Sequence, residues 1–225
     1  MKISAVVCAH NEQDSIEDVL HKLARLGSLY ELIVVDDGSI DSTAQIAEGA
    51  GAQVLALRPN QGKGRAIAAG IKAARGDWVL FIDGDGQDHP RDVPKLIQAA
   101  TDGADLVNGS KFIGSIERGA ISGPNYWGNR LMSGLINLLF GARISDSQSG
   151  FRLIRAKFLK ALQLRSAQYE IETEILISAL KQGLRVVEVP VLRSPRSAGR
   201  TDFRRIRNGL RILWTILRLR MRRDR

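Results

Sequence analysis

The stretch that decides the fold is residues 78–87, WVLFIDGDGQ, in which an apolar run ends at two carboxylates. A run of this kind is typical of a strand buried on both faces of a parallel sheet, and ligands bind at the carboxyl ends of such strands. Asp83 and Asp85 repel one another unless a cation lies nearby, and Mg²⁺ or Mn²⁺ typically takes one or two carboxylates. The stretch predicts a metal site; an Asp-Gly turn without a ligand is the alternative.

Short β-branched segments alternate with helical patterns through the first hundred residues. The predicted strands span 3–9, 31–35, 53–57, 78–82 and 104–108, and the predicted helices span 15–26, 42–50, 64–74 and 92–101. Helices over 125–140, 156–162 and 170–182 and a strand over 185–189 follow. Repeated strand–helix units predict an α/β fold with a mostly parallel sheet flanked by helices.

The composition is that of an ordinary globular protein, with 225 residues, 44% hydrophobic and 25% charged. The single cysteine, Cys8, lies in the apolar run 3–9, so we interpret it as a small core residue in a reducing compartment. The N-terminus lacks the charged and apolar sections of a signal peptide. We therefore expect a cytoplasmic protein.

The positive charge is concentrated at the C-terminus. The net charge is +9, but residues 193–225 hold twelve arginines against Asp202 and Asp224, which leaves the other residues at −1. A basic arm on a near-neutral domain favours one local contact, with a membrane surface or a polyanion, over a globally basic nucleic-acid-binding protein.

The basic tail also carries an apolar pattern at helical spacing. One face of the expected helix holds Phe203, Ile206, Leu210, Leu213, Trp214, Leu217 and Met221, with Arg204, Arg207, Arg211, Arg218 and Arg222 beside it. The pattern predicts a C-terminal amphipathic helix over 203–225 that lies on anionic lipid, attached to a domain over 1–202. Its apolar run is too short to span a bilayer.

Two other interpretations of the tail remain open. The helix could pack on the domain through its apolar face, with solvated arginines. It could also be a nucleic-acid arm, but Phe203 and Trp214 are its only aromatic residues and both lie on the apolar face, so we expect no nucleic acid. A membrane-protein partner or a homo-oligomer is compatible with the pattern.

Polar blocks follow several of the predicted strands. Asn11-Glu12 follows the first, Val34-Val35-Asp36-Asp37-Gly38-Ser39 ends the second, and the carboxyl ends of parallel strands line one crevice. Later blocks are NQGKG at 60–64, GSK at 109–111, Asp146 with SGFR at 149–152, and EVP at 188–190. In this order they resemble family 2 glycosyltransferases with the Rossmann-like GT-A fold, and more closely polyprenyl-phosphate (dolichyl-phosphate) mannose or glucose synthases. The resemblance extends from about residue 3 to residue 203.

The resemblance implies a set of site residues. The nucleoside diphosphate sugar would contact Cys8, His10, Glu12, Val35, Asp37, Asp83, Gly84, Asp85, Lys111, Arg196 and Arg200. Mg²⁺ or Mn²⁺ would lie at Asp83, Asp85 and Gln87, and the catalytic residues would be Asp85, Lys111 and Arg130. Helix capping and turn formation are the alternative for Glu12 and Asp37.

The chain departs from the family pattern at two positions. Lys111 stands where an arginine is usual, and Asp202 replaces the lysine that ends the motif beginning at Arg196. Arg200 could supply the missing charge, because a guanidinium binds phosphate bidentately.

The resemblance implies inverting transfer of a hexose, from a donor of the GDP-mannose or UDP-glucose type, to a polyprenyl phosphate. An ionised lipid phosphate needs cations and no general base, and Lys111, Arg118 and Arg130 follow the metal block. A saccharide hydroxyl acceptor is the nearest competitor, with Asp146 or Glu172 as its base. A nucleotidyltransferase is disfavoured because no glycine-rich basic loop follows residues 3–9.

Overall fold

The computed structural model describes residues 1–196 and 205–222, apart from the side chain of Arg205. Within these residues seven strands form one sheet in the order β3-β2-β1-β4-β6-β5-β7. The strands are β1 (Ile3–Ala9), β2 (Glu31–Asp36), β3 (Gln53–Ala56), β4 (Trp78–Asp83), β5 (Leu106–Ile116), β6 (Arg152–Arg155) and β7 (Val186–Arg193). Most neighbouring pairs are parallel, which confirms the predicted mostly parallel α/β sheet.

The first four strands follow the sequence prediction closely. β1 spans the predicted residues, and β2, β3 and β4 differ from their predicted ranges by one residue at the carboxyl end. β1 lies between β2 and β4, and its residues are almost all buried because helices cover both faces of the sheet. The carboxyl ends of β1, β2 and β4 therefore meet at one edge.

β6 was not predicted. It pairs antiparallel with both β4 and β5, with Arg152 opposite Phe81 and Asn108. Four residues are too few for a hydrophobic period to be recognised, and the following helical pattern concealed the strand. Because β6 runs against β4, the segment before Arg152 arrives at the same edge where β4 ends.

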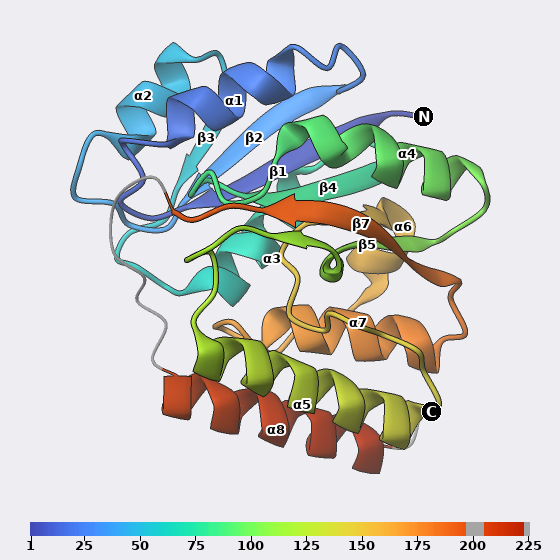
Figure 1. Ribbon diagram of the computed structural model, residues 1–225. Coiled ribbons are helices and arrows are strands. Elements are labelled where there is room, and N and C mark those ends of the chain that lie inside the picture. Colours follow the sequence, from blue (N-terminus) through green and yellow to red (C-terminus); the bar gives the residue numbers. More distant parts are fainter. Residues whose placement is uncertain (197–204, 223–225) are drawn as a thin grey trace.

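The helices form layers on either side of the sheet (Figure 1). One face carries α1 (Ile16–Ala24), α2 (Thr43–Gly49), the short 3₁₀ turn η1 (Pro90–Asp92) and α4 (Val93–Thr101). The other face carries α3 (Lys63–Ala73), α6 (Ala156–Ala161) and α7 (Ile171–Lys181). Beyond α7, α5 (Gly123–Phe140) and α8 (Arg205–Met221) lie side by side and share a third apolar cluster with it.

The predicted C-terminal helix is present as α8, and it packs on the domain through a face that the sequence did not single out. Ile212, Ile216 and Leu219 are buried against α5 and α7. The predicted apolar face instead points outward: Ile206, Leu210, Trp214, Leu217 and Met221 are all exposed. α8 is therefore apolar on two faces. Among the described helices, none combines the length and the apolar character needed to cross a bilayer.

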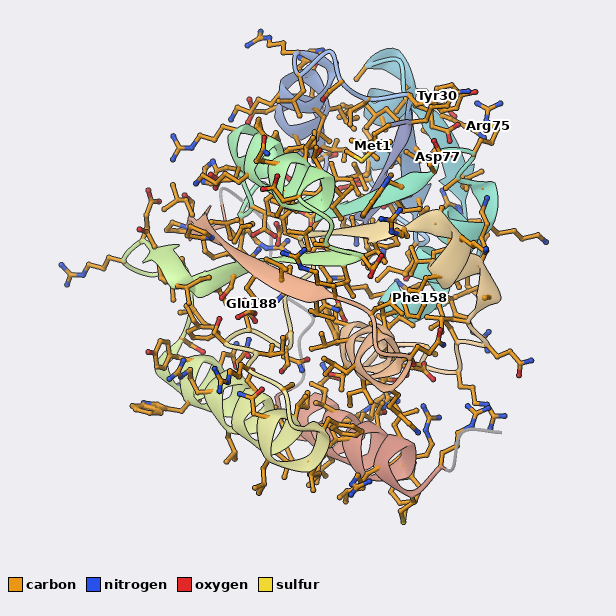
Figure 2. The ribbon with its side chains drawn as sticks, turned by 90° about the vertical axis from the view of Figure 1, so that its right-hand side faces the viewer. Met1, Tyr30, Arg75, Asp77, Phe158 and Glu188 are labelled. Atoms are coloured by element: carbon orange, nitrogen blue, oxygen red, sulfur yellow. The ribbon has the colours of Figure 1, made fainter. Side chains whose placement is uncertain are left out.

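The amino edge of the strands is closed by local contacts (Figure 2). The backbone N–H of Tyr30 donates to the carbonyl of Ile3, that of Asp77 donates to Lys2, and Arg75 pairs with Glu31 at 2.8 Å. Open space near the sheet lies at the opposite, carboxyl edge.

Candidate active site

A cleft of about 1190 Å³ opens at the carboxyl edge of β1, β2 and β4. The sequence-predicted residues that line it are Cys8, His10, Glu12, Asp37, Asp83, Gly84, Asp85, Gln87, Lys111 and Arg196. Val35 lies elsewhere, because its side chain is fully buried in the core of the sheet. Arg200 and Asp202 lie outside the described residues, so their predicted roles stay predictions.

Local hydrogen bonds hold the turn that carries the two aspartates. The N–H of Gly84 donates to the carbonyl of Cys8 at 3.0 Å, and the hydroxyl of Ser15 donates to the carbonyl of Gly84 at 2.8 Å. The carboxylate of Asp85 accepts the N–H of Gln87 at 3.0 Å. The end of β4 is thus fixed to β1 and α1, so Asp83 and Asp85 enter the cleft from a rigid support.

Lys63 joins two buried carboxylates at the floor of the cleft. Its Nζ lies 2.9 Å from Oδ2 of Asp83 and 2.8 Å from Oε1 of Glu172. Burial alone would lower the pKa of Lys63, but the two carboxylates outweigh burial and hold that pKa above its usual value. A Cβ added at Gly150 would lie 3.0 Å from both Asp83 Oδ2 and Lys63 Nζ. The absence of a side chain at this glycine therefore lets the segment just before β6 lie against the Asp83–Lys63 pair.

Burial dominates the acid–base behaviour of the other groups at this floor. It raises the pKa of the Glu172 carboxyl despite the nearby Lys63, and it raises the pKa of the Cys8 thiol. Cys8 is therefore a neutral thiol in the cleft wall, in keeping with its predicted packing role.

Arg196 spans the cleft between Glu12 and Asp85. Its Nη1 donates to Oε1 of Glu12 at 2.7 Å and its Nη2 donates to Oδ2 of Asp85 at 3.2 Å. Burial raises the pKa of Glu12 to about 7, and Arg196 offsets part of that effect. The predicted diphosphate-binding arginine and the predicted metal-binding aspartate are therefore in direct contact.

Arg193 is a cleft residue that the sequence interpretation missed. It donates to Asp88 at 2.7 Å and to the amide oxygen of Gln87 at 2.8 Å. The amide nitrogen of Gln87 donates to the carbonyl of Ser194 at 3.0 Å, so both ends of this side chain are bonded within the protein. The sequence offered one indication of this role, because Arg193 lies three residues before Arg196. The sequence interpretation instead grouped Arg193 with the basic tail.

Asp37 organises the glycine-rich turn before α3. Its two oxygens accept the backbone N–H groups of Gln61 and Gly62 at 2.7 and 2.8 Å. The turn-forming alternative for Asp37 is thus realised, and the side chain still lines the cleft. His10 lies beside it, and its buried Nδ1 has no hydrogen-bond partner among the described residues.

Lys111 and Asp146 form a buried pair on the other side of the cleft. Lys111 Nζ lies 2.6 Å from Oδ2 of Asp146, and Asn129 of α5 donates to the other carboxylate oxygen at 2.8 Å. Glu188 supports the segment by accepting hydrogen bonds from Ser145 and Asp146 (Figure 2). Because both oxygens of Asp146 are bonded, this residue braces Lys111 and is not placed as a general base.

The other predicted acceptor-side cations are at the surface. Arg130 lies over the ring of Phe112, 5.7 Å from its centroid, and does not line the cleft. Arg118 is also exposed. The structure therefore brings Lys111 into the cleft and places Arg130 and Arg118 outside its lining.

The donor set fits a divalent metal that shares its coordination with phosphate. Among residues 1–196 and 205–222, no three Asp, Glu, His or Cys side chains converge as a preformed metal site. Mg²⁺ and Mn²⁺ need only one or two carboxylates when a diphosphate and water complete the shell. Asp83 and Asp85 provide hard oxygen donors, and each is already paired with a cationic side chain, Lys63 and Arg196 respectively.

Comparisons with known proteins agree with this geometry. The model of the family "Glycosyl transferase family 2" matches residues 4–163. An undecaprenyl-phosphate 4-deoxy-4-formamido-L-arabinose transferase of Edwardsiella ictaluri is 33% identical, covering 89% of this chain and 62% of the relative. A dolichol-phosphate mannosyltransferase of Pyrococcus furiosus is 31% identical, covering 91% of this chain and 60% of the relative. The chain thus spans less than two thirds of either relative.

Solved structures show the same fold. Glucosyl-3-phosphoglycerate synthase of Mycobacterium tuberculosis, in complex with Mn²⁺, UDP and glucosyl-3-phosphoglycerate, superposes with a TM-score of 0.79 at 27% identity. The match covers 99% of this chain and 81% of that one. The expected GT-A fold and the resemblance to polyprenyl-phosphate sugar transferases are confirmed. The chain belongs to glycosyl transferase family 2 and is a glycosyltransferase.

Proposed function

We propose that this enzyme transfers a hexose, with inversion, from a nucleoside diphosphate sugar of the GDP-mannose or UDP-glucose type to a polyprenyl phosphate at a membrane surface. The observation that carries the proposal is the composition of the cleft. Asp83 and Asp85 lie at the carboxyl end of β4, and Lys111 lines the same cleft and is paired with Asp146. The named activities of the Edwardsiella and Pyrococcus relatives, which act on polyprenyl phosphates, support the same acceptor class.

The donor would bind with its diphosphate beside Asp83 and Asp85. A bound Mg²⁺ or Mn²⁺ would supply charge that stabilises the leaving diphosphate. Arg196 donates a hydrogen bond to Asp85, and this proximity supports a role for its guanidinium in binding the diphosphate oxygens. Glu12, Asp37 and His10 line the part of the cleft assigned to the nucleoside.

An oxygen of the acceptor phosphate would attack the anomeric carbon. The bond from that carbon to the diphosphate oxygen breaks, and its electron pair leaves with the nucleoside diphosphate. A phosphate oxygen is already ionised at neutral pH, so no proton has to be removed. Both oxygens of Asp146 are hydrogen-bonded, which disfavours this residue as the base that a hydroxyl acceptor would need.

The outer faces of α5 and α8 support action at a membrane surface. Trp127, Leu131 and Leu138 of α5 and Leu210 and Trp214 of α8 are exposed large apolar residues on neighbouring helices. Arg130 of α5 and Arg220 of α8 are exposed, as is Arg222 just after α8. An apolar surface with arginines at its edge suits an interface with anionic lipid.

Transfer assays test the function. Purified protein is incubated with radiolabelled GDP-mannose or UDP-glucose and undecaprenyl or dolichyl phosphate, with Mn²⁺ or with EDTA. We expect a labelled lipid product that disappears in EDTA. Labelled product from a saccharide or from 3-phosphoglycerate, with none from either lipid phosphate, contradicts the proposed acceptor.

Vesicle flotation tests the membrane contact. Leu210→Glu with Trp214→Glu is expected to abolish flotation with anionic vesicles, because two exposed apolar side chains of the proposed membrane contact become charged. Ile40→Glu is the matched control, since Ile40 is an exposed apolar residue outside α5 and α8. Equal flotation of both proteins removes α8 from the proposed contact.

A further inference from the structure

Three arginines of α8 lie on one side of the helix, and each either lines the cleft or pairs with α7. Arg207, Arg211 and Arg218 occupy one face of the helix by their spacing, between the packed face and the exposed apolar face. Arg218 pairs with Glu174 of α7 at 2.9 Å, while Arg207 and Arg211 line the cleft. The sequence pattern had placed all three beside a lipid-binding face.

Neither of the two cleft-lining arginines forms an ion pair with a described residue. The other cations of the cleft are paired: Lys63 with Asp83 and Glu172, Lys111 with Asp146, Arg193 with Asp88, and Arg196 with Glu12 and Asp85. No carboxylate of the described residues pairs with Arg207 or Arg211. An anion that enters this side of the cleft therefore meets two guanidinium groups that are free to bind it.

Asn208, between these arginines, gives a second and independent indication of a ligand. It is only 5% exposed and lines the cleft, and its side chain makes no hydrogen bond to another described residue. Its amide atoms are not among the fully buried polar atoms, so their donors and acceptor remain accessible from the cleft. Asn208 is thus positioned to bond a ligand in the cleft.

We infer that Arg207, Asn208 and Arg211 form the binding site for the phosphate of the acceptor. The inference rests on the proposed function and deepens it, since it assigns α8 to the active site as well as to the membrane surface. Lys111 alone would bind a phosphate dianion weakly, because the Asp146 carboxylate, 2.6 Å from Lys111 Nζ, offsets its charge. Two guanidinium groups and an amide N–H supply the missing charge and donors, and guanidinium groups bind phosphate bidentately.

Further lining of this side of the cleft is compatible with an anion. Ser122, Pro124 and Asn125 belong to the start of α5, where backbone N–H groups lack partners within the helix. Gly209 leaves open space, since a Cβ added there would meet no atom within 4 Å. The site thus lies between the first turns of α5 and α8, across the cleft from the carboxylates that bind the donor.

The test separates acceptor binding from attraction to bulk lipid. Geranyl phosphate, a short acceptor used below its micelle concentration, is titrated by calorimetry into full-length protein with nucleoside diphosphate and Mn²⁺ present. The variants are Arg207→Ala, Arg211→Ala and the control Arg220→Ala. Arg220 lies on the same helix, is exposed and does not line the cleft. Arg220→Ala therefore removes the same charge from α8 without changing the cleft.

We expect Arg207→Ala and Arg211→Ala each to weaken geranyl phosphate binding by about tenfold or more, as for the loss of a charge-assisted hydrogen bond. Arg220→Ala should bind it like the wild type, and all variants should bind the nucleoside diphosphate normally. Asn208→Ala should give a smaller loss, and Arg211→Lys should recover part of the affinity. In flotation with anionic vesicles, Arg220→Ala should lose as much vesicle binding as Arg207→Ala and Arg211→Ala, because each variant removes one positive charge.

Distinct results overturn the site or the function. Equal geranyl phosphate affinity in Arg207→Ala, Arg211→Ala and Arg220→Ala overturns the site, even if lipid transfer occurs. Competition by 3-phosphoglycerate or inorganic phosphate at concentrations below that of geranyl phosphate assigns the site to a soluble phosphate and overturns the lipid source. Binding that follows the prediction without any sugar transfer to lipid leaves the site standing and overturns the proposed function. Thermal melting confirms that each variant is folded.

Discussion

Nη2 of Arg218 lies 2.9 Å from Oε1 of Glu174, so the last turns of α8 are tied to the first turn of α7. The other oxygen of Glu174 accepts the backbone N–H groups of Arg165 and Ser166 at 3.0 and 2.8 Å. The next residue, Ala167, accepts the N–H of Gly64 at the start of α3. A single buried carboxylate thus connects α8 to the helix that carries Lys63.

Breaking this pair should destabilise the protein and weaken donor binding. Arg218→Ala leaves a buried carboxylate with only backbone donors, at an expected cost of about 1–2 kcal/mol, reduced because Arg218 is partly exposed. Urea unfolding measures this cost, and Arg220→Ala should stay within about 0.5 kcal/mol of the wild type. Nucleotide affinity in the absence of lipid should fall for Arg218→Ala only, and Arg218→Lys should restore part of it. Equal effects of the two alanine variants contradict the connection.

Asp85→Asn should abolish metal-dependent transfer. Removing the proposed metal-binding charge is expected to lower the rate by about 10²–10³-fold, the range for losing a main electrostatic stabiliser. Electron paramagnetic resonance of free Mn²⁺ in the presence of nucleoside diphosphate should show lost binding. Asp105→Asn, at a surface carboxylate that pairs with Arg155, is the matched control. Normal Mn²⁺ binding by Asp85→Asn excludes Asp85 as the metal ligand.

Glu12 should make stability fall between mildly acidic and neutral pH. Its pKa is about 7 in the folded protein and near 4.5 when exposed, so the folded state binds the extra proton between these values. The stabilising contribution is complete below the unfolded pKa and is lost as the pH rises through about 7.

Glu12→Gln removes that titration. Between pH 5 and pH 8, measured in EDTA, the wild type should lose about 1–2 kcal/mol of unfolding free energy relative to Glu12→Gln, a figure reduced for partial solvation. Parallel stability profiles for the two proteins would show that the Glu12 pKa is not raised.

Gly64→Ala should destabilise the protein and weaken donor binding, whereas Gly134→Ala should do neither. An added Cβ at Gly64 would lie 2.4 Å from the carbonyl oxygen of Ser166 and 2.7 Å from the carbonyl carbon of Ala167. Backbone must move to relieve that clash, so we expect a loss of about 2 kcal/mol or more and a higher KM for the donor. The same change at Gly134 in α5 meets open space and should stabilise the helix by up to about 1 kcal/mol. Unchanged donor KM in Gly64→Ala contradicts the role of this contact.

The sequence predicted the parallel half of the fold well, because long apolar runs define buried strands. β1 was predicted to the residue, and the DGD turn was placed at the correct edge of the sheet. β6 was not predicted because a segment of four residues is too short to show the alternation of apolar and polar residues that identifies a strand. Which apolar face of α8 packs on the domain could not be predicted, since Ile212 and Ile216 form a face as apolar as Leu210 and Trp214.

The structure brings together the predicted residues that follow strand ends, whereas contacts between distant segments were not predicted. Glu12, Asp37, Asp83 and Asp85 line one cleft, as their positions after parallel strands implied. Val35 precedes Asp37 in the same block but points into the core. Arg193 could not be separated from the rest of the basic tail, because its contact with Asp88 spans more than a hundred residues.

α8 should tolerate fewer amino-acid substitutions than an ordinary surface helix. One side packs in the core, another exposes large apolar residues, and the row between them bears Arg207, Arg211 and Arg218. A saturation mutagenesis profile of the chain should accordingly rank this helix with the interior strands in its intolerance of substitution, and Arg220 should stand out as a permissive position within it.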